Sequence, residues 1–239
     1  MMSDPVGELS GVTGRAHPRQ LALTLPHAES HAREDFLAGP SNEAALAMIE
    51  SWPAWPSPVL MLVGEAGAGK SHLASIWAER SGARAIASRN LAVGGVPAAL
   101  ATGALVIEDI DPAAVDQHAL FHLLNLAREQ GADVLLTART MPAGWTLSVR
   151  DLASRLRAVP VARLLAPDED LLRALLIKFC TDRQMVVDET VLSYLLPRIE
   201  RSFLAARQTV EALDAEALRL GRPITRALAA EVLRDVSPG

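Results

Sequence analysis

The sequence predicts an α/β fold in which a parallel β-sheet lies between two layers of helices and is followed by a small, all-helical domain. Two observations support this fold class. Short apolar runs alternate with segments of helical periodicity between residues 59 and 165, and this alternation is typical of parallel strands joined by crossover helices. After Pro167 only helical periodicity remains. We therefore expect a domain boundary at residues 166–167.

The composition narrows the class of protein further. The chain has 239 residues, enough for one large domain or two smaller ones. It carries 23 Lys and Arg residues against 28 Asp and Glu, a net charge of −5, and so lacks the basic surplus of a free-standing DNA-binding protein. Its single cysteine, Cys180, excludes an internal disulfide and favours a reducing, cytoplasmic location. The longest apolar run, Val59–Val63, is far shorter than the roughly 20 residues that span a bilayer, so no membrane association is expected.

The N-terminal segment is predicted to stay outside the sheet. Residues 1–19 are rich in Gly, Ser, Pro and His without apolar periodicity, which is typical of a disordered tail. Leucines alternate in residues 20–26 as in an extended segment, but a proline ends it and no partner strand follows closely. Residues 44–50 then form a predicted helix, capped by Ser41 and Asn42.

Five apolar runs predict the strands of the sheet: Val59–Val63, residues 83–87, Ala104–Ile110, residues 134–137 and residues 159–165. Two helical segments between them, Lys70–Ser81 and residues 115–130, place apolar side chains three and four positions apart. Beyond the boundary we expect four helices: residues 168–183, a short one capped by Asp188, residues 201–220 and residues 225–236. The predicted division is a tail at 1–19, a peptide at 20–26, an α/β domain at 27–166 and a helical domain at 167–239.

A glycine-rich loop lies between the first predicted strand and the first long helix. It comprises Gly64, Glu65, Ala66, Gly67, Ala68, Gly69, Lys70 and Ser71, and His72 follows it in the helix. Glycines let successive backbone N–H groups point into one anion-binding concavity, and the helix N-terminus adds positive potential. Lys70 is expected to reach the β and γ phosphates of a nucleotide and Ser71 to bind Mg²⁺. The alternative is a coincidental glycine-rich turn, but the strand–loop–helix context favours a phosphate site.

Two acids end the third predicted strand. Because parallel strands bring their carboxyl ends to one edge of the sheet, Glu108 and Asp109 are expected to lie near the loop. Glu108, where Asp is the commoner residue, is predicted to hold Mg²⁺ through water, and Asp109 to orient an attacking water. The alternative is a strand end with ordinary surface acids.

Other residues carry weaker signals. His118 and His122 have the spacing of two metal ligands on a helix, but no third ligand accompanies them, and a polar helix surface is the better interpretation. Cys180 is expected to be a small buried residue. Trp52 and Trp55 are expected to cover the sheet edge rather than to stack on bases.

These motifs resemble a known family. The loop, residues 105–109, residues 151–156 (Asp-Leu-Ala-Ser-Arg-Leu) and the C-terminal helices are similar to the AAA+ module of the bacterial initiator DnaA. Residues 20–26 and 33–37 are more specifically similar to the DnaA-homologous regulatory inactivators, the Hda family, in their alphaproteobacterial form. The resemblance covers nearly the whole chain, and it implies a P-loop AAA+ domain followed by a helical lid.

The resemblance also implies a protein partner for the N-terminal peptide. The family binds the sliding clamp, the β subunit of DNA polymerase III, through a Gln-Leu-x-Leu-x-Leu peptide, which corresponds here to Gln20, Leu21, Leu23 and Leu25. An extended peptide with alternating apolar side chains suits a hydrophobic groove. An edge strand or a plain linker is the alternative. DNA is then expected to be reached only through the clamp.

A second implied partner is DnaA itself. Arg155 corresponds to the family's arginine finger, which acts in trans on ATP bound to DnaA, so that replication initiation is negatively regulated. Such a finger accelerates hydrolysis by about 10³- to 10⁵-fold. The alternative is an ordinary arginine near a helix end. ADP or ATP with Mg²⁺ is the implied cofactor, and dimerisation of the free protein stays open.

The chain departs from the family pattern at both sensor positions. Where the family has a sensor I acid after the fourth strand, residues 136–140 here contain none, and Thr137 is the candidate substitute. Leu204 takes the place of the sensor II arginine, with Arg201 and Arg207 about one turn to either side. We therefore expect nucleotide to act as a structural switch that is turned over slowly if at all. No segment matching DnaA's DNA-box domain follows the lid, so specific origin recognition is not expected. The competing hypothesis is an autonomous AAA+ ATPase, such as a helicase loader.

Overall fold

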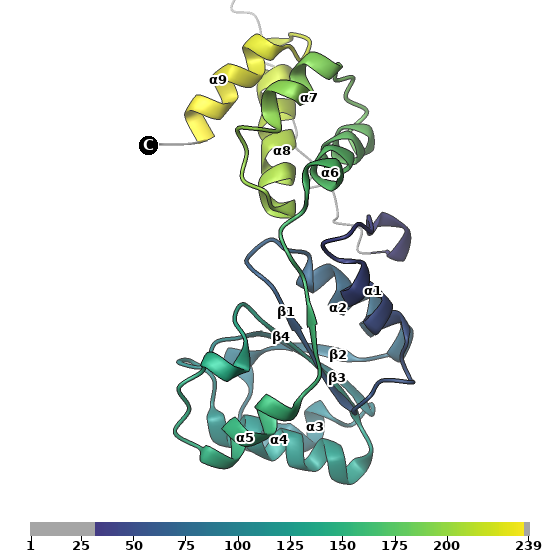
Figure 1. The fold of residues 1–239 in the computed structure, drawn as a ribbon, viewed down its shortest axis with the longest axis vertical. Coiled ribbons are helices and arrows are strands. Elements are labelled where there is room, and N and C mark those ends of the chain that lie inside the picture. Colours follow the sequence, from purple (N-terminus) through teal and green to yellow (C-terminus); the bar gives the residue numbers. More distant parts are fainter. Residues whose placement is uncertain (1–31, 237–239) are drawn as a thin grey trace, which may run out of the picture.

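The computed structural model describes residues 32–236, which form an α/β domain and, beyond one end of it, a helical domain (Figure 1). The predicted tail at 1–19 and the predicted peptide at 20–26 lie outside the described residues. Within the described part of the chain, no helix has both the length and the apolar character needed to cross a membrane.

The sheet has five parallel strands in the order β2-β3-β4-β1-β5. The strands are β1 Val59–Val63, β2 Arg84–Ala87, β3 Ala104–Ile110, β4 Asp133–Ala138 and β5 Val161–Arg163. The three central strands are almost continuously apolar and buried because helices cover both faces of the sheet. The predicted α/β fold class is confirmed.

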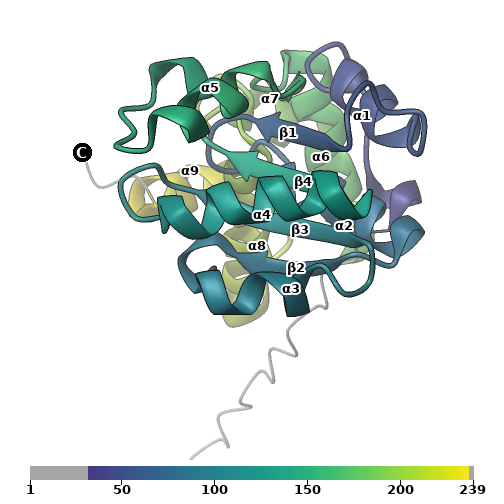
Figure 2. The same cartoon turned by 90° about the horizontal axis from the view of Figure 1, so that it is seen from below.

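Successive residues of β1 point into different cores. Leu60 and Leu62 belong to a cluster with helices α1 (Glu43–Glu50) and α2 (Lys70–Ser81). Met61 and Val63 belong to the other large cluster, whose helices are α3 (Val96–Ala99), α4 (Gln117–Gln130) and α5 (Arg150–Ala158). This alternation follows from the two-residue period of a strand and produces three layers, which lie one above another in Figure 1, whereas Figure 2 looks onto the sheet with α4 in front of the strands.

Several element ends differ from the sequence predictions. Helix α4 starts two residues later than predicted, at Gln117, because the Asp116 side chain accepts hydrogen bonds from the next turn and caps the helix there. Strand β5 is shorter than the predicted 159–165, because Val159 still bonds back to Leu156 at the end of α5. Helices α3 and α5 and four 3₁₀ segments were not among the predicted elements. The 3₁₀ segments are η1 Arg33–Asp35, η2 Ser88–Asn90, η3 Val93–Gly95 and η4 Pro142–Gly144.

The helical domain, which we call the lid, has a core of its own. It comprises α6 Glu169–Asp182, α7 Glu189–Leu195, α8 Phe203–Leu220 and α9 Arg226–Val236. The side chains of Asp168, Asp188 and Ser202 cap the first three of these helices. Cys180 is buried in this core, as predicted.

The segment before α1, residues 32–42, is called the arm below. Asn42 was predicted to cap α1, but its side chain makes no capping bond. Its amide instead accepts a hydrogen bond from Gly39 N–H and donates one to the Leu37 carbonyl, both at 2.9 Å. Asn42 is almost fully buried, so these bonds fix the course of the arm.

Trp52 and Trp55 lie against Trp77 on the α1–α2 face of the sheet. The Trp55 ring stacks on Trp77 with 4.9 Å between ring centroids, and Trp52 meets it edge-on at 6.3 Å. The indole N–H of Trp52 donates to Asp133 at the start of β4. Both rings are therefore structural, and neither is free to stack on a base.

Candidate functional site

The glycine-rich loop connects β1 to α2, as the sequence predicts. Gly67 and Gly69 have φ angles of 71° and 96°, which favour glycine, and Gly69 immediately precedes the first helical residue, Lys70. The N–H groups in the first turn of a helix lack partners within the helix, so the loop and α2 together offer donors to an anion. The Lys70 ammonium lies over the loop and donates to the carbonyls of Gly64 and Glu65 at 2.6 and 2.8 Å.

The electrostatic surroundings of Lys70 favour a bound anion. Burial lowers the pKa of Lys70 below its ordinary value, and the nearby positive charge of Arg139 acts in the same direction. The negative charges of Asp109 and Glu65 only partly offset this effect. A phosphate bound at the loop would add the missing negative charge, and the site therefore favours an anionic ligand.

The two acids of β3 lie at the carboxyl end of the sheet, where the β3–β4 register is irregular. Asp109 has a φ of 55°, a left-handed conformation that is uncommon outside glycine. Its N–H donates to the Thr137 hydroxyl at 2.9 Å, and its carbonyl accepts from the Ser88 hydroxyl at 2.7 Å. The buried Thr137 therefore holds the backbone of the second acid in place, while Glu108 beside it is half-buried.

The Asp109 carboxylate is held only loosely. It pairs with Arg139 at 3.5 Å, and the side chains are 63% and 61% exposed, so the pair contributes little to stability. The described residues contain no cluster of three or more His, Cys, Asp or Glu that could hold a metal ion. A Mg²⁺ ion here would need ligands from a bound phosphate and from water in addition to Ser71 and Glu108, which is how Mg²⁺ is usually bound beside phosphates.

A cavity of about 590 Å³ adjoins the loop. Its lining includes Gly67, Lys70 and His72 from the loop and α2, Phe36 from the arm, and Lys178 and Leu204 from the lid. The volume is within the range of small-molecule sites. The cavity therefore lies between the two domains and is closed on one side by lid helices α6 and α8.

The lid touches the loop directly. The Phe203 N–H at the start of α8 donates to the Gly67 carbonyl at 3.0 Å. The Cβ of Leu204 lies only 2.5 Å from where a Cβ on Gly67 would be placed. Leu204, at the predicted sensor II position, therefore presents an apolar side chain to the loop.

An aromatic layer joins the arm, α2 and the lid. The Phe36 ring stacks on Phe203 with 6.4 Å between centroids and meets the His72 ring edge-on at 5.2 Å. A ring nitrogen of His72 also lies 3.0 Å from the Ala32 carbonyl. These contacts bring together three segments that are far apart in the sequence around one side of the cavity.

Comparison of the chain with solved structures identifies its fold. No protein-family model matches the chain. Domain III of the replication initiator DnaA from Thermotoga maritima is 21% identical and matches 87% of this chain and 98% of its own length, with a TM-score of 0.73. The chain has an AAA+ fold. Two other structures share this fold. AMPPCP-bound DnaA from Aquifex aeolicus is 17% identical and matches 80% of this chain and 68% of its own length, with a TM-score of 0.63. The Holliday junction branch migration motor RuvB from T. maritima is 16% identical and matches 87% of this chain and 72% of its own length, with a TM-score of 0.69.

Within this AAA+ fold, Arg155 is not part of the cavity. It lies on α5, with its guanidinium carbon 5.1 Å from the centroid of the Phe121 ring on α4. It is absent from the residues that line the cavity in the described part of the chain. Asp109 lies near enough to Lys70 to affect its pKa, but Glu108, Asp109 and Arg155 are all absent from the cavity lining. Gln20, Leu21, Leu23 and Leu25 lie outside the described residues.

The remaining predicted and unpredicted residues can be placed as well. His118 is exposed and His122 half-exposed on α4, so neither contributes to the cavity. Sequence reasoning did not identify Phe36, Lys178 or Asp35 as site residues. Phe36 falls within residues 33–37, which carry part of the family resemblance. That resemblance is the sequence signal that could have identified Phe36 as a site residue.

Proposed function

We propose that this protein is a nucleotide-bound AAA+ regulator of the DnaA-homologous regulatory inactivator type, which restrains replication initiation. It binds the sliding clamp through Gln20, Leu21, Leu23 and Leu25. From there it stimulates hydrolysis of ATP bound to DnaA, with Arg155 as the arginine finger. It contacts DNA only through the clamp and acts in the cytoplasm.

Nucleotide binding is supported by the loop geometry and the cavity beside it. The glycine-rich loop opens a helix, Lys70 lies over it, and the lid closes the cavity next to it. DnaA structures of the same fold contain AMPPCP, an ATP analogue. ADP or ATP with Mg²⁺ is therefore the proposed ligand, with the phosphates on the loop and Mg²⁺ between Ser71 and Glu108.

The lid contact favours a regulator over an active motor. The apolar Leu204 lies against Gly67, so this position itself offers no guanidinium to a γ-phosphate, while Arg207 in the next turn of α8 lines the cavity. The water-orienting acid, Asp109, is paired with Arg139 at an exposed position. Both features predict slow turnover, so the nucleotide serves to hold the domains in one arrangement.

The position of Arg155 supports a role in trans. Its side chain is partly exposed on α5 and lies outside the chain's own cavity. A partly exposed guanidinium in that position is open to a nucleotide held by another molecule. This single observation carries the proposal that the protein completes a partner's active site.

A reconstituted assay tests the proposal. Clamp loaded on DNA, DnaA carrying labelled ATP and this protein are combined, and DnaA-bound ADP is followed with either ADP or ATP added. Arg155→Ala is expected to abolish stimulation while clamp binding persists, and Arg157→Ala, an exposed arginine on the same helix, is the matched control. Full activity of Arg155→Ala would exclude the finger assignment.

The clamp contact has its own test. Gln20→Ala combined with Leu23→Ala is expected to abolish clamp association in a pull-down, because the proposed peptide loses its polar and central apolar anchors. Nucleotide affinity, measured by calorimetry, should stay unchanged. Unchanged clamp recovery would contradict the peptide assignment.

The second candidate is an autonomous AAA+ ATPase such as a helicase loader. The observation in its favour is that Lys70, Glu108 and Asp109 are all present at the loop and the adjoining edge of the sheet. Steady-state hydrolysis by the isolated protein, abolished in Lys70→Ala and without clamp binding, would support this candidate. Hydrolysis near background together with nucleotide binding that depends on Lys70 supports the regulator.

A further inference from the structure

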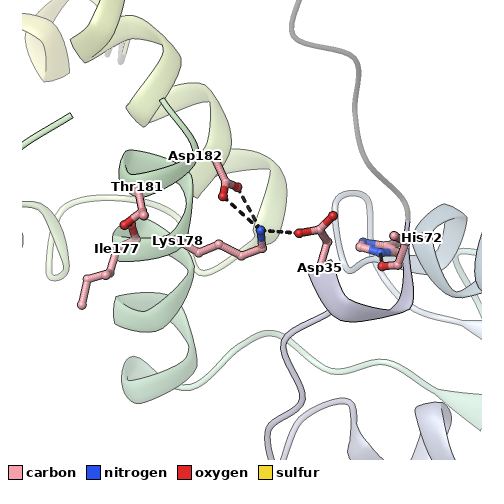
Figure 3. Close-up of polar contacts among 7 residues, drawn as sticks. Asp35, His72, Ile177, Lys178, Thr181 and Asp182 are labelled. Carbon is pink, nitrogen blue, oxygen red and sulfur yellow. Dashed lines mark hydrogen bonds and ion pairs between the residues drawn. The ribbon is translucent and has the colours of Figure 1, made fainter. Parts of the chain in front are cut away.

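One lysine of the lid forms a bridge to the arm beside the cavity. The ammonium of Lys178 on α6 lies 2.6 Å from a carboxylate oxygen of Asp35 in η1 and 2.9 Å from one of Asp182 on its own helix (Figure 3). All three residues line the cavity. The bridge therefore connects two segments that are 143 positions apart in the sequence, next to the proposed nucleotide site.

The bridge is more protected than an ordinary surface ion pair. The side chains of Lys178 and Asp35 are 19% and 26% exposed. Burial opposes the charge on Lys178, but the hydrogen bonds to Asp35 and Asp182 outweigh it and raise the pKa of Lys178 above its ordinary value. Charge-assisted hydrogen bonds in a partly buried position are stronger than exposed pairs, so this contact contributes to the position of the lid.

The arm is itself fixed to the α/β domain. His72 on α2 meets the Ala32 carbonyl, Phe36 is buried in the core cluster of α1 and α2, and Arg33 pairs with Glu50 of α1. A lid residue that binds the arm is therefore bound to the α/β domain. The lid is thus held beside the cavity by this bridge, by the hydrogen bond of Phe203 to Gly67 and by the stacking of Phe203 on Phe36.

We propose that Lys178 is a latch residue, which holds α6 against the arm and thereby sets how fast a nucleotide leaves the cavity. This inference rests on the proposed nucleotide site. A ligand bound between the loop and the lid leaves when the lid moves away, and that movement requires the contacts of Lys178 with Asp35 to break. Asp182 orients the lysine as an i,i+4 partner and remains with it when the lid moves.

The rate of nucleotide dissociation tests the latch. Fluorescent mant-ADP is bound to the full chain and its release after mixing with excess ADP is followed by stopped flow. Lys178→Met keeps most of the side-chain volume and removes the charge, and we expect release to become roughly tenfold faster, as for the loss of a charge-assisted contact. The matched control is Arg173→Met, which removes an ion pair of the same helix to Glu189, within the lid. It should leave the rate within twofold of wild type.

A charge exchange keeps the test valid if a single variant is unstable. Lys178→Asp and Asp35→Lys each place like charges together and should each accelerate release. The double variant again sets one lysine between two carboxylates and should restore much of the wild-type rate. Rates in the double variant that equal the product of the single effects would overturn the latch.

Hydrogen exchange of the ligand-free protein separates the latch from the proposed nucleotide site. Faster exchange is expected for amides in residues 33–37 of Lys178→Met, without any nucleotide present. Wild-type protein that fails to bind mant-ADP would refute the proposed nucleotide site, and this exchange result would still test the latch. Unchanged exchange and unchanged release in Lys178→Met would overturn the latch alone.

Discussion

The contact between the lid and the loop predicts an unusually costly alanine substitution at Gly67. A Cβ at this position would lie 2.5 Å from the Leu204 Cβ and 3.1 Å from the Leu204 nitrogen. Both neighbours belong to the first turn of α8, so neither can move without moving the helix. Gly67→Ala must therefore either strain the loop or displace the lid.

Gly82 provides a matched control for the backbone component of this cost. Its φ is 70°, against 71° for Gly67, and no heavy atom lies within 4 Å of a Cβ built on it. Gly82→Ala should therefore lose about 1–2 kcal/mol, the cost of placing an L-residue in the left-handed region. Gly67→Ala carries the same strain and adds a steric overlap with Leu204. Overpacking of this kind typically costs a further 1–3 kcal/mol.

Urea unfolding followed by circular dichroism measures the free energy of unfolding of both variants, and calorimetry measures their affinity for ADP. Gly67→Ala should be less stable than Gly82→Ala by about 1–3 kcal/mol and should bind ADP more weakly, whereas Gly82→Ala should bind it as wild type does. Equal stabilities with equal affinities would show that α8 does not rest on the loop in solution, and would refute the reasoning.

Three further predictions concern the lid. Ser202→Ala removes the cap of α8 and should lower the free energy of unfolding by about 1 kcal/mol in urea titrations, with Ser202→Asn retaining most of it. Burial raises the pKa of the Cys180 thiol to about 11, so a disulfide reagent at pH 8 should react at least about a hundredfold more slowly with the native than with the urea-unfolded protein. Hydrogen bonds from the Thr190 hydroxyl and the Val191 N–H lower the pKa of Asp188, so its stabilisation is present above the unfolded-state pKa and is lost as the pH falls through the lower folded value. Asp188→Asn, which keeps a capping side chain, should flatten this part of the stability–pH curve, and an unaltered curve would contradict the assignment.

The sheet and the long helices could be predicted because their signals are local. Each central strand contains an unbroken run of at least three apolar residues. Most long helices have a capping residue or a closing glycine next to them in the sequence, as Asp116 and Gly131 are for α4. Helix α3 could not be predicted, because its four residues are too few for a periodic pattern. Val96 and Ala99 are held there by burial in the core.

Only those parts of the site that consist of consecutive residues could be predicted. The loop and the acids of β3 are short motifs, and strand order brings them to one edge. The Lys178–Asp35 bridge joins residues that no sequence pattern relates, and Asn42 has the residue type of a helix cap but faces the arm instead. Such pairings depend on how the lid and the arm meet, and this is decided by tertiary packing.

Two of the contacts between the lid and the rest of the chain differ in chemistry, and this difference predicts how salt affects nucleotide release. The contact of Leu204 with Gly67 is apolar and steric, so it is insensitive to salt, whereas the Lys178–Asp35 bridge is ionic and weakens as ionic strength rises. If both hold the lid over a bound nucleotide, salt should accelerate nucleotide release more in the wild type than in Lys178→Met, in which only the salt dependence of the phosphate contacts remains. Leu204 itself offers no cation to the phosphates, whereas Lys178, Arg183 and Arg207 of the lid line the cavity. The proposed regulator would then keep its own nucleotide bound while it acts on a partner's ATP through Arg155.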